Sequence, residues 1–171
     1  METGTRPARR DDVTALATLM VEFYEEAGFA LSDDAAAHGF TCLLDDPRLG
    51  ETWVVEQDGI PVGYLVLTFG FSMEFGGMRG FVDDFFVRPG ARGRGLGGAA
   101  LDTIRRACGE RGIRALLVET GPDDHRARPL YARAGFEANG RVFLSQALAS
   151  AVHEPHRPPP PRESVPRPEP S

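Results

Sequence analysis

The chain has 171 residues, 42% of them apolar, and a formal net charge of −6 at pH 7. This length and apolar content suit one domain with a single core, and the negative charge argues against a nucleic-acid-binding surface. No apolar run approaches the length of a membrane span, so we expect a cytoplasmic protein that does not bind membranes. Cys42 and Cys108 lack the spacing of metal ligands, which favours free thiols and no metal site.

The N-terminal half is expected to contain strands at both ends and two helices between them. Apolar residues at helical spacing follow Asp11 and Asp12 and stop before Gly28, which predicts a helix capped by one of these aspartates. The other expected elements are strands over 5–9, 53–55 and 62–69, a second helix from Ser32 or Asp33 to about Leu44, and a hairpin turn at Asp58-Gly59.

The C-terminal half alternates strands and helices. Periodicity and turn residues set their boundaries, with Gly135 in the place of a helix C-cap. The expected elements, in chain order, are a strand over 81–87, a helix over 99–111, a buried strand over 115–119, a short helix over 126–134, and a last strand from Arg141 to Leu148.

The composition changes abruptly after Ala149. Eight of the 14 prolines lie beyond Leu148, among arginine, glutamate and serine, with almost nothing apolar. Such a segment buries too little surface to fold. We therefore expect residues 1–149 to form the domain and residues 150–171 to form a disordered, proline-rich tail.

The segment from Val87 to Gly98 joins an apolar strand to an amphipathic helix through a glycine-rich turn. The first N–H groups of a helix lack intrahelical partners and carry partial positive charge. Glycines let the backbone approach a phosphate closely, and Arg92 and Arg94 add charged, forked donors. The segment therefore predicts a site for a phosphate-bearing ligand, with a cofactor as the first candidate.

Two classes of cofactor fit this segment. Residues 93–98 match the dinucleotide pattern G-x-G-x-x-G, and Glu119 supplies an acid at the end of the next strand. The alternative pattern is Arg92-x-x-Gly95-x-Gly97. In a dinucleotide-binding fold the strand runs almost directly into the first glycine, and this pattern usually lies near the start of the domain. Here several residues separate the strand from the first glycine and a sizeable block precedes the turn, so the alternative pattern is favoured. In addition, roughly thirty residues remain before the tail, too few for the second half of a doubly wound sheet.

The alternative pattern, preceded by Val87-Arg88-Pro89, resembles the pyrophosphate-binding motif of the GNAT acetyltransferases. A second motif supports the resemblance, which covers about residues 5–148. Asp124 stands where the family's N-x-x-A-x-x-x-Y-x-x-x-G-F helix has Asn, and Pro129 departs from that pattern and predicts a kink. The residues that match this motif are Ala127, Tyr131, Gly135 and Phe136.

The resemblance implies a mixed α/β (α+β) GNAT fold: a central mixed sheet of about six to seven strands flanked by helices, with splayed parallel strands at the cofactor site. It implies direct acetyl transfer from acetyl-CoA to a primary amine of a small molecule, protein or peptide. Many relatives form dimers, so a homodimer is one expected assembly. The cofactor contacts that it implies come from Phe85, Phe86, Val87, Arg92, Gly93, Arg94, Gly95, Leu96, Gly97, Gly98 and Asp124.

This chemistry requires a proton acceptor for the amine and a proton donor for the departing thiolate. Asp84 is the favoured proton acceptor and Asp83 is the alternative. Successive strand residues face opposite sides of the sheet, so only one of the two faces the amine unless the strand bulges. Tyr131 matches the family's general-acid tyrosine. The candidate carboxylates for binding a cationic acceptor are Glu22, Glu25, Glu26 and Glu74.

Two other functions are compatible with parts of the sequence. The departures at Asp124 and Pro129 are compatible with a regulatory acyl-CoA-binding module that has little turnover. The dinucleotide pattern is compatible with a nucleotide-dependent oxidoreductase, which is less favoured. Turnover with a set of amines would separate an enzyme from a binding module, and thermal protection by NADH would favour the oxidoreductase.

Overall fold

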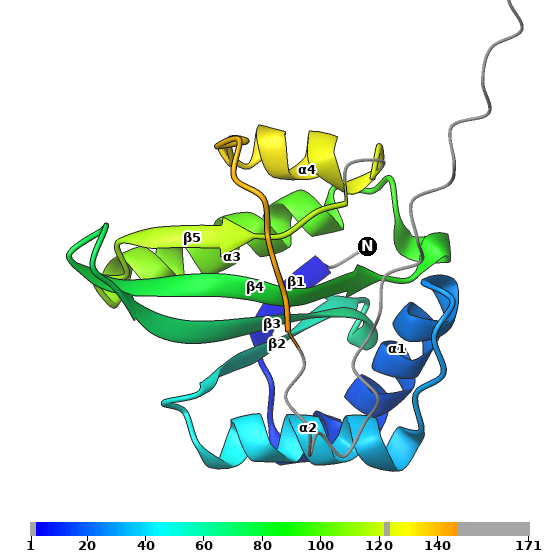
Figure 1. Ribbon diagram of the computed structural model, residues 1–171. Coiled ribbons are helices and arrows are strands. Elements are labelled where there is room, and N and C mark those ends of the chain that lie inside the picture. The colour runs from blue at the N-terminus through cyan, green and yellow to red at the C-terminus, as the bar shows by residue number, and fades with distance from the viewer. Residues whose placement is uncertain (1–2, 122–123, 147–171) are drawn as a thin grey trace, which may run out of the picture. The chain divides into compact units, whose positions relative to one another are not determined.

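The computed structural model describes residues 3–121 and 124–146, so the expected tail over 150–171 lies outside the described residues. All the elements belong to one compact unit that ends at Arg141, and Figure 1 shows their arrangement. In chain order they are β1 (Thr3–Pro7), α1 (Val13–Glu26), α2 (Asp33–Asp45), β2 (Gly50–Gln57), β3 (Ile60–Ser72), β4 (Gly77–Val87), α3 (Leu96–Glu110), β5 (Ala115–Val118) and α4 (Ala127–Arg133).

The strands form one sheet in the order β1-β2-β3-β4-β5. Neighbouring strands are antiparallel except β4 and β5, which run parallel. A mixed sheet flanked by helices confirms the predicted fold class. The described residues contribute five strands to this sheet, fewer than the expected number.

The difference in strand number comes from the end of the domain. A strand was expected from Arg141 to Leu148, but residues 141–146 form no strand, and residues 147 and 148 lie outside the described residues. Alternating apolar residues such as Val142 and Leu144 are a local signal. A strand also needs a hydrogen-bonding partner from a distant part of the chain, which local alternation does not provide.

Apolar side chains cover both faces of the sheet. Helices α1 and α2 lie on one side and α3 and α4 on the other (Figure 1). Successive strand residues point to opposite faces, so Tyr64 and Leu65 fall into different layers. The layer under α1 and α2 contains Leu16, Leu19, Phe40, Val54, Tyr64, Val66 and Phe86. The layer under α3 and α4 contains Trp53, Leu65, Leu67, Val82, Leu101, Ile104, Cys108 and Tyr131.

Local sequence sets several element boundaries as predicted. The β2–β3 turn places Asp58 and Gly59 at φ values of 52° and 74°, which suits a type I′ hairpin turn. Ser32 caps α2, because its Oγ accepts a hydrogen bond from the Ala35 N–H at 3.2 Å. Gly28 follows the end of α1 with φ of 87°, a conformation that glycine adopts without strain.

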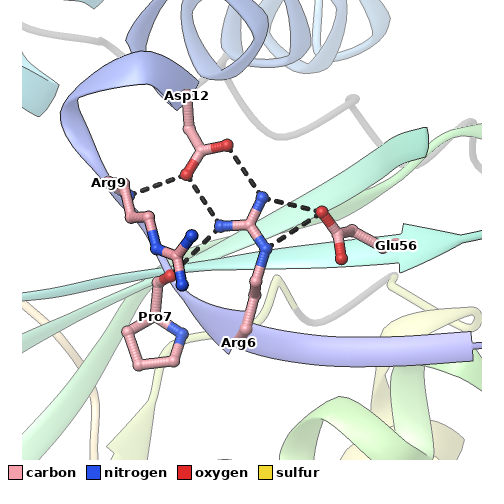
Figure 2. A network of polar contacts seen from close by, with 5 residues as sticks. All are labelled: Arg6, Pro7, Arg9, Asp12 and Glu56. Atoms are coloured by element: carbon pink, nitrogen blue, oxygen red, sulfur yellow. Dashed lines mark hydrogen bonds and ion pairs between the residues drawn. The ribbon is translucent and has the colours of Figure 1, made fainter. Parts of the chain in front are cut away.

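Asp12 occupies the N-cap position of α1 as predicted, but its side chain belongs to a charge network and does not cap the helix within the described residues. It accepts the Arg9 N–H at 2.7 Å and two bonds from the Arg6 guanidinium at 2.8 and 2.9 Å (Figure 2). Arg6 also donates to Glu56 on β2, at 3.0 and 2.7 Å. The network therefore joins β1, β2 and the chain entering α1.

Replacing Asp12 with asparagine is expected to destabilise the domain by about 1–2 kcal/mol, since charge-assisted hydrogen bonds are stronger than neutral ones and the Asp12 side chain is 12% exposed. Hydrogen bonds from Arg6 hold the pKa of Asp12 below its ordinary value. The stabilisation is therefore present above pH 3.8 and is lost as pH falls through the lower folded-state pKa. Melting temperatures of Asp12→Asn and of the exposed control Asp11→Asn, measured from pH 3 to pH 8, test this. Equal melting temperatures at pH 7 would contradict it.

Candidate active site

The turn between β4 and α3 takes up a backbone conformation that requires glycine. A 3-10 turn over Pro89–Ala91 follows β4. Gly93 and Gly95 then have φ values of 77° and 81°, in the left-handed region that other residues rarely adopt. Helix α3 begins directly after Gly95, at Leu96, three residues before the predicted start. The glycine-rich pattern therefore includes the N-cap and the first residues of α3.

The start of α3 presents backbone N–H groups to a pocket. Gly95 occupies the N-cap position and has no side chain to accept a hydrogen bond, and the first hydrogen bond of the helix runs from the Ala99 N–H to the Gly95 carbonyl at 3.0 Å. The N–H groups of residues 96–98 therefore remain available at the positive end of the helix. The pocket there has a volume of about 440 Å³ and is lined by Val87, Arg92, Gly93, Gly95, Leu96, Gly97, Gly98, Asp102, Leu130, Arg133 and Ala134.

Arg92, which was predicted to contact the cofactor, forms hydrogen bonds with β4 and α1. Its Nε donates to the Val87 carbonyl at 2.6 Å, and its two Nη atoms donate to the Glu26 carboxylate at 2.8 and 2.7 Å. Its guanidinium also lies 5.5 Å from the centre of the Phe86 ring. The Arg92 guanidinium lowers the pKa of Glu26. Arg94 lies exposed on the turn. Glu26, which was predicted to bind the cationic acceptor, therefore forms an ion pair with Arg92, which was predicted to bind the cofactor.

Strands β4 and β5 pair over a short stretch, from Arg79–Ala115 to Val82–Val118. Hydrogen-bonded and non-hydrogen-bonded pairs alternate along an antiparallel ladder. The Arg88 N–H donates to the Val62 carbonyl of β3 at 2.8 Å, so the N–H groups of Phe85 and Val87 point away from β3. They face the side on which β5 has left the sheet. By the same alternation, the backbone of Phe86 faces β3.

A β-bulge lies at the two aspartates of β4. Val66 of β3 pairs with Asp84 and the next residue, Leu67, pairs with Val82, so Asp83 is an extra residue in β4. The bulge shifts the alternation of side chains along the strand. Val82 and Phe85, three residues apart, consequently both pack in the layer under α3 and α4.

Both aspartates act on the side of the sheet that α1 and α2 cover. The Tyr64 hydroxyl donates to Asp84 Oδ2 at 3.2 Å, and the charges of Asp83 and Asp84 both raise the pKa of Tyr24 on α1. Sequence reasoning allowed only one of the two to face the acceptor unless the strand bulged. The bulge is present, and the charges of both carboxylates act on Tyr24.

Asp84 is the more perturbed of the two aspartates. Its burial, together with the neighbouring charge of Asp83, raises its pKa from 3.8 to about 6, although the hydrogen bond from Tyr64 opposes that rise. Burial also raises the pKa of Asp83, whose side chain is the more exposed. A carboxylate with a pKa near 6 is mostly ionised at pH 7 and is a stronger base than an ordinary aspartate.

Tyr131 lies on the opposite side of β4. It is 9% exposed, belongs to the layer under α3 and α4, and packs edge-on against Phe136 with ring centres 5.5 Å apart. Burial, with smaller contributions from the charges of Asp124 and Asp84, raises its pKa to about 12. The phenol is therefore protonated at neutral pH and able to donate.

The two departures from the α4 motif have local structural roles. Asp124 Oδ1 accepts the N–H groups of Ala127 and Arg126 at 2.9 and 3.2 Å, which stabilises the start of α4 as a cap does. Pro129 is the third residue of the helix, where its missing N–H would have no intrahelical partner. The kink predicted at Pro129 is therefore unnecessary, because the proline lies in the first turn.

Besides Glu26, two more of the four carboxylates predicted to bind the cationic acceptor contact arginines. Glu22 on α1 forms two bonds with Arg88, at 2.7 and 2.6 Å, and Glu74 forms two bonds with Arg141, at 2.8 Å each. The Arg141 guanidinium lowers the pKa of Glu74. Glu25 is exposed on α1. Glu22 and Glu25 lie within one turn of α1, whereas Glu74 follows β3. Sequence reasoning did not identify Tyr64, whose hydroxyl donates to Asp84, or Tyr24, whose pKa both aspartates raise.

Residues 3–121 and 124–146 contain no group of three or more histidine, cysteine, aspartate or glutamate side chains that could hold a metal ion. Over those same residues, no helix has the length and apolar content needed to cross a bilayer.

Sequence comparison identifies the family. The profile of the Acetyltransferase (GNAT) family matches residues 13–136. A curated relative, the uncharacterized N-acetyltransferase YhfO of Bacillus subtilis (strain 168), is 30% identical over 135 residues, which cover 77% of this chain and 88% of the relative.

Solved structures share the fold. An integron cassette protein from the mobile metagenome of Cole Harbour Salt Marsh is 56% identical, with a TM-score of 0.79 over 88% of this chain and 93% of that chain. A predicted acetyltransferase from Clostridium acetobutylicum, solved with acetyl-CoA, is 19% identical with a TM-score of 0.70, covering 89% of this chain and 100% of that one. The family profile and the curated relative together establish that the chain belongs to the GNAT family of N-acetyltransferases.

Proposed function

We propose that this N-acetyltransferase moves an acetyl group from acetyl-CoA directly to a primary amine of a small molecule, protein or peptide. One observation carries the proposal. A proton acceptor, Asp84, and a proton donor, Tyr131, lie on opposite faces of β4, beside the point where β4 separates from β5. An amine approaching from the α1–α2 side would meet the base, and a leaving group on the α4 side would meet the acid.

The residues at the turn fit acetyl-CoA. The N–H groups of residues 96–98 are suited to a pyrophosphate, and Gly98 has nothing within 4 Å of the position a Cβ would take, so the backbone is open to close approach. The N–H groups of Phe85 and Val87 would hold the acyl-bearing arm along β4 and polarise its carbonyl. When bound, acetyl-CoA supplies an acetyl group activated as a thioester. The solved neighbour from Clostridium acetobutylicum contains this ligand.

Asp84 and Tyr131 would perform complementary proton transfers. An amine attacks a carbonyl only when neutral, and the Asp84 carboxylate, with its pKa of about 6, would accept the proton directly or through water. Tyr131, with its pKa of about 12, would supply a proton to the departing sulfur. Their different environments keep one ionised and the other neutral at pH 7, which suits a base and an acid working together.

The direct test is a set of amines incubated with acetyl-CoA, with the release of free thiol as the readout. Thiol release that depends on one class of amine supports the proposal. Thermal protection by acetyl-CoA without turnover of any amine would favour a binding module. Protection by NADH, but not by acetyl-CoA, would favour the oxidoreductase.

Tyr131→Phe is expected to lower kcat by roughly 100-fold, the lower end of the range for general acid catalysis. The ring still packs against Phe136, so the melting temperature and the affinity for acetyl-CoA should change little. The measurement is the pH–rate profile on the amine that the screen identifies. Alkaline pH supplies no acid, so raising the pH should not restore the rate. Recovery at high pH would contradict the assignment.

A further inference from the structure

We propose that Tyr64 is a positioning residue that holds the Asp84 carboxylate in place for proton removal, an inference that rests on the proposed function of Asp84. The two residues come from adjacent strands and share the face of the sheet under α1 and α2. Tyr64 pairs with Phe86, and Asp84 pairs with Val66, so Tyr64 and Asp84 are diagonal neighbours across the β3–β4 ladder. The Tyr64 hydroxyl donates to Asp84 Oδ2 at 3.2 Å.

The donor is rigidly held. The Tyr64 side chain is 0% exposed, with the Phe40 ring edge-on at 5.4 Å and the Phe86 ring at 6.4 Å. Because the Tyr64 ring is buried and packed between two other aromatic rings, it has little room to change its rotamer. Its hydroxyl is therefore held in one position. Asp84, by contrast, sits beside the extra residue of a bulge, where strand pairing alone does not fix the direction of a side chain. The hydrogen bond supplies that direction.

A neutral donor suits this position better than a cation. An arginine or lysine here would lower the pKa of Asp84 strongly and make it a weak base. Burial and the nearby aspartates instead raise the pKa of Tyr64, so the phenol keeps its proton and donates throughout the neutral range. The titratable groups that change the pKa of Asp84 are Asp83 of β4 and Tyr64 of β3. Tyr24 of α1 and Tyr131 of α4 are protonated phenols whose own pKa values the charge of Asp84 raises.

The test is the pH–rate profile of Tyr64→Phe, which keeps the ring and removes the donor. Loss of the bond should raise the pKa of Asp84, so the acidic limb of kcat/KM should move up by roughly one pH unit. The plateau kcat should fall by roughly 3- to 10-fold because the base is less well placed, while the KM for acetyl-CoA should not change. The matched control is Tyr24→Phe, whose hydroxyl donates to neither aspartate within the described chain and which should leave the limb in place.

Two further measurements separate the possible failures. In an Asp84→Asn background, Tyr64→Phe should cause little additional loss, because its effect passes through Asp84. If Asp84→Asn is impaired but Tyr64→Phe leaves the limb unmoved, the positioning role is wrong and the proposed function stands. If Asp84→Asn is fully active, the base itself is misassigned.

A second variant covers poor folding of Tyr64→Phe. A ring-fluorinated tyrosine placed at position 64 alone keeps the shape and strengthens the donor, because fluorination makes the phenol more acidic. The acidic limb should then move to lower pH. An unmoved limb in that protein would overturn the inference.

Discussion

Replacing Asp84 with asparagine is expected to lower kcat by roughly 10²–10⁴-fold at pH 7, the usual contribution of a general base. Asparagine keeps the size of the side chain and can still accept the Tyr64 hydroxyl, so the geometry should persist. The loss should shrink as pH rises, because a growing fraction of the amine is then already neutral. This recovery distinguishes Asp84→Asn from Tyr131→Phe, for which alkaline pH offers no substitute. Equal, pH-independent losses in the two variants would contradict the division of roles.

The same substitution should make the folded protein more stable. Asp84 has a folded-state pKa of about 6, above its ordinary value of 3.8. The folded state therefore favours the protonated form, and stability falls as pH rises from about 4 to about 6. Asp84→Asn removes this penalty, so we expect a gain of about 1–2 kcal/mol at pH 8, less than the full shift implies because the carboxylate is partly exposed. The gain should disappear near pH 4.

Asp83→Asn is the matched control for both effects. Its carboxylate is more exposed and has no side-chain hydrogen bond from the described residues, so its loss should affect kcat less than that of Asp84. It should also lower the pKa of Asp84, because the charge of Asp83 is one of the causes of that raised value. The acidic limb would then move to lower pH. A larger loss of kcat in Asp83→Asn than in Asp84→Asn would transfer the base role to Asp83.

Features that depend on a few adjacent residues could be predicted from the sequence. The Asp58-Gly59 turn and the Ser32 cap each require one local conformation, and the two motifs around Gly95 and Tyr131 encode a helix start and a short helix. These features identified the fold class and the pocket. The strand expected to begin at Arg141 is absent over residues 141–146. Alternation of apolar residues is a local pattern, whereas a strand also needs a partner from a distant part of the chain.

Contacts between distant residues could not be predicted in this way. Glu26 and Arg92 are 66 positions apart, as are Glu22 and Arg88, and both pairs depend on how α1 packs on the sheet. Tyr64 carried no signal in the sequence, because an aromatic residue in a buried strand is ordinary core. Its link to Asp84 depends on the register of β3 with β4 and on a bulge of one residue, and such a shift redirects every side chain beyond it.

Gly98→Val is expected to abolish the binding of acetyl-CoA and leave the fold intact. Gly98 is the third residue of α3, and it and Asp102, one turn later, both line the pocket. A Cβ at Gly98 would meet nothing within 4 Å of the protein, so valine costs the domain little. It would, however, occupy the space that a pyrophosphate needs beside the helix N–H groups. Gly95 is a poorer choice because its φ of 81° strains any substitution.

Gly109→Val is the matched control for Gly98→Val. Gly109 also lies in α3 with nothing within 4 Å of its Cβ position, and eleven residues complete about three helical turns, so it occupies nearly the same face beyond the pocket. At a ligand concentration 100-fold above Kd, binding adds about 2.7 kcal/mol to stability. The wild type and Gly109→Val should therefore melt several degrees higher with acetyl-CoA, and Gly98→Val should not. A full shift in Gly98→Val would place the cofactor away from the start of α3, whereas losing the shift in both variants would mean that changes anywhere along α3 disturb the site.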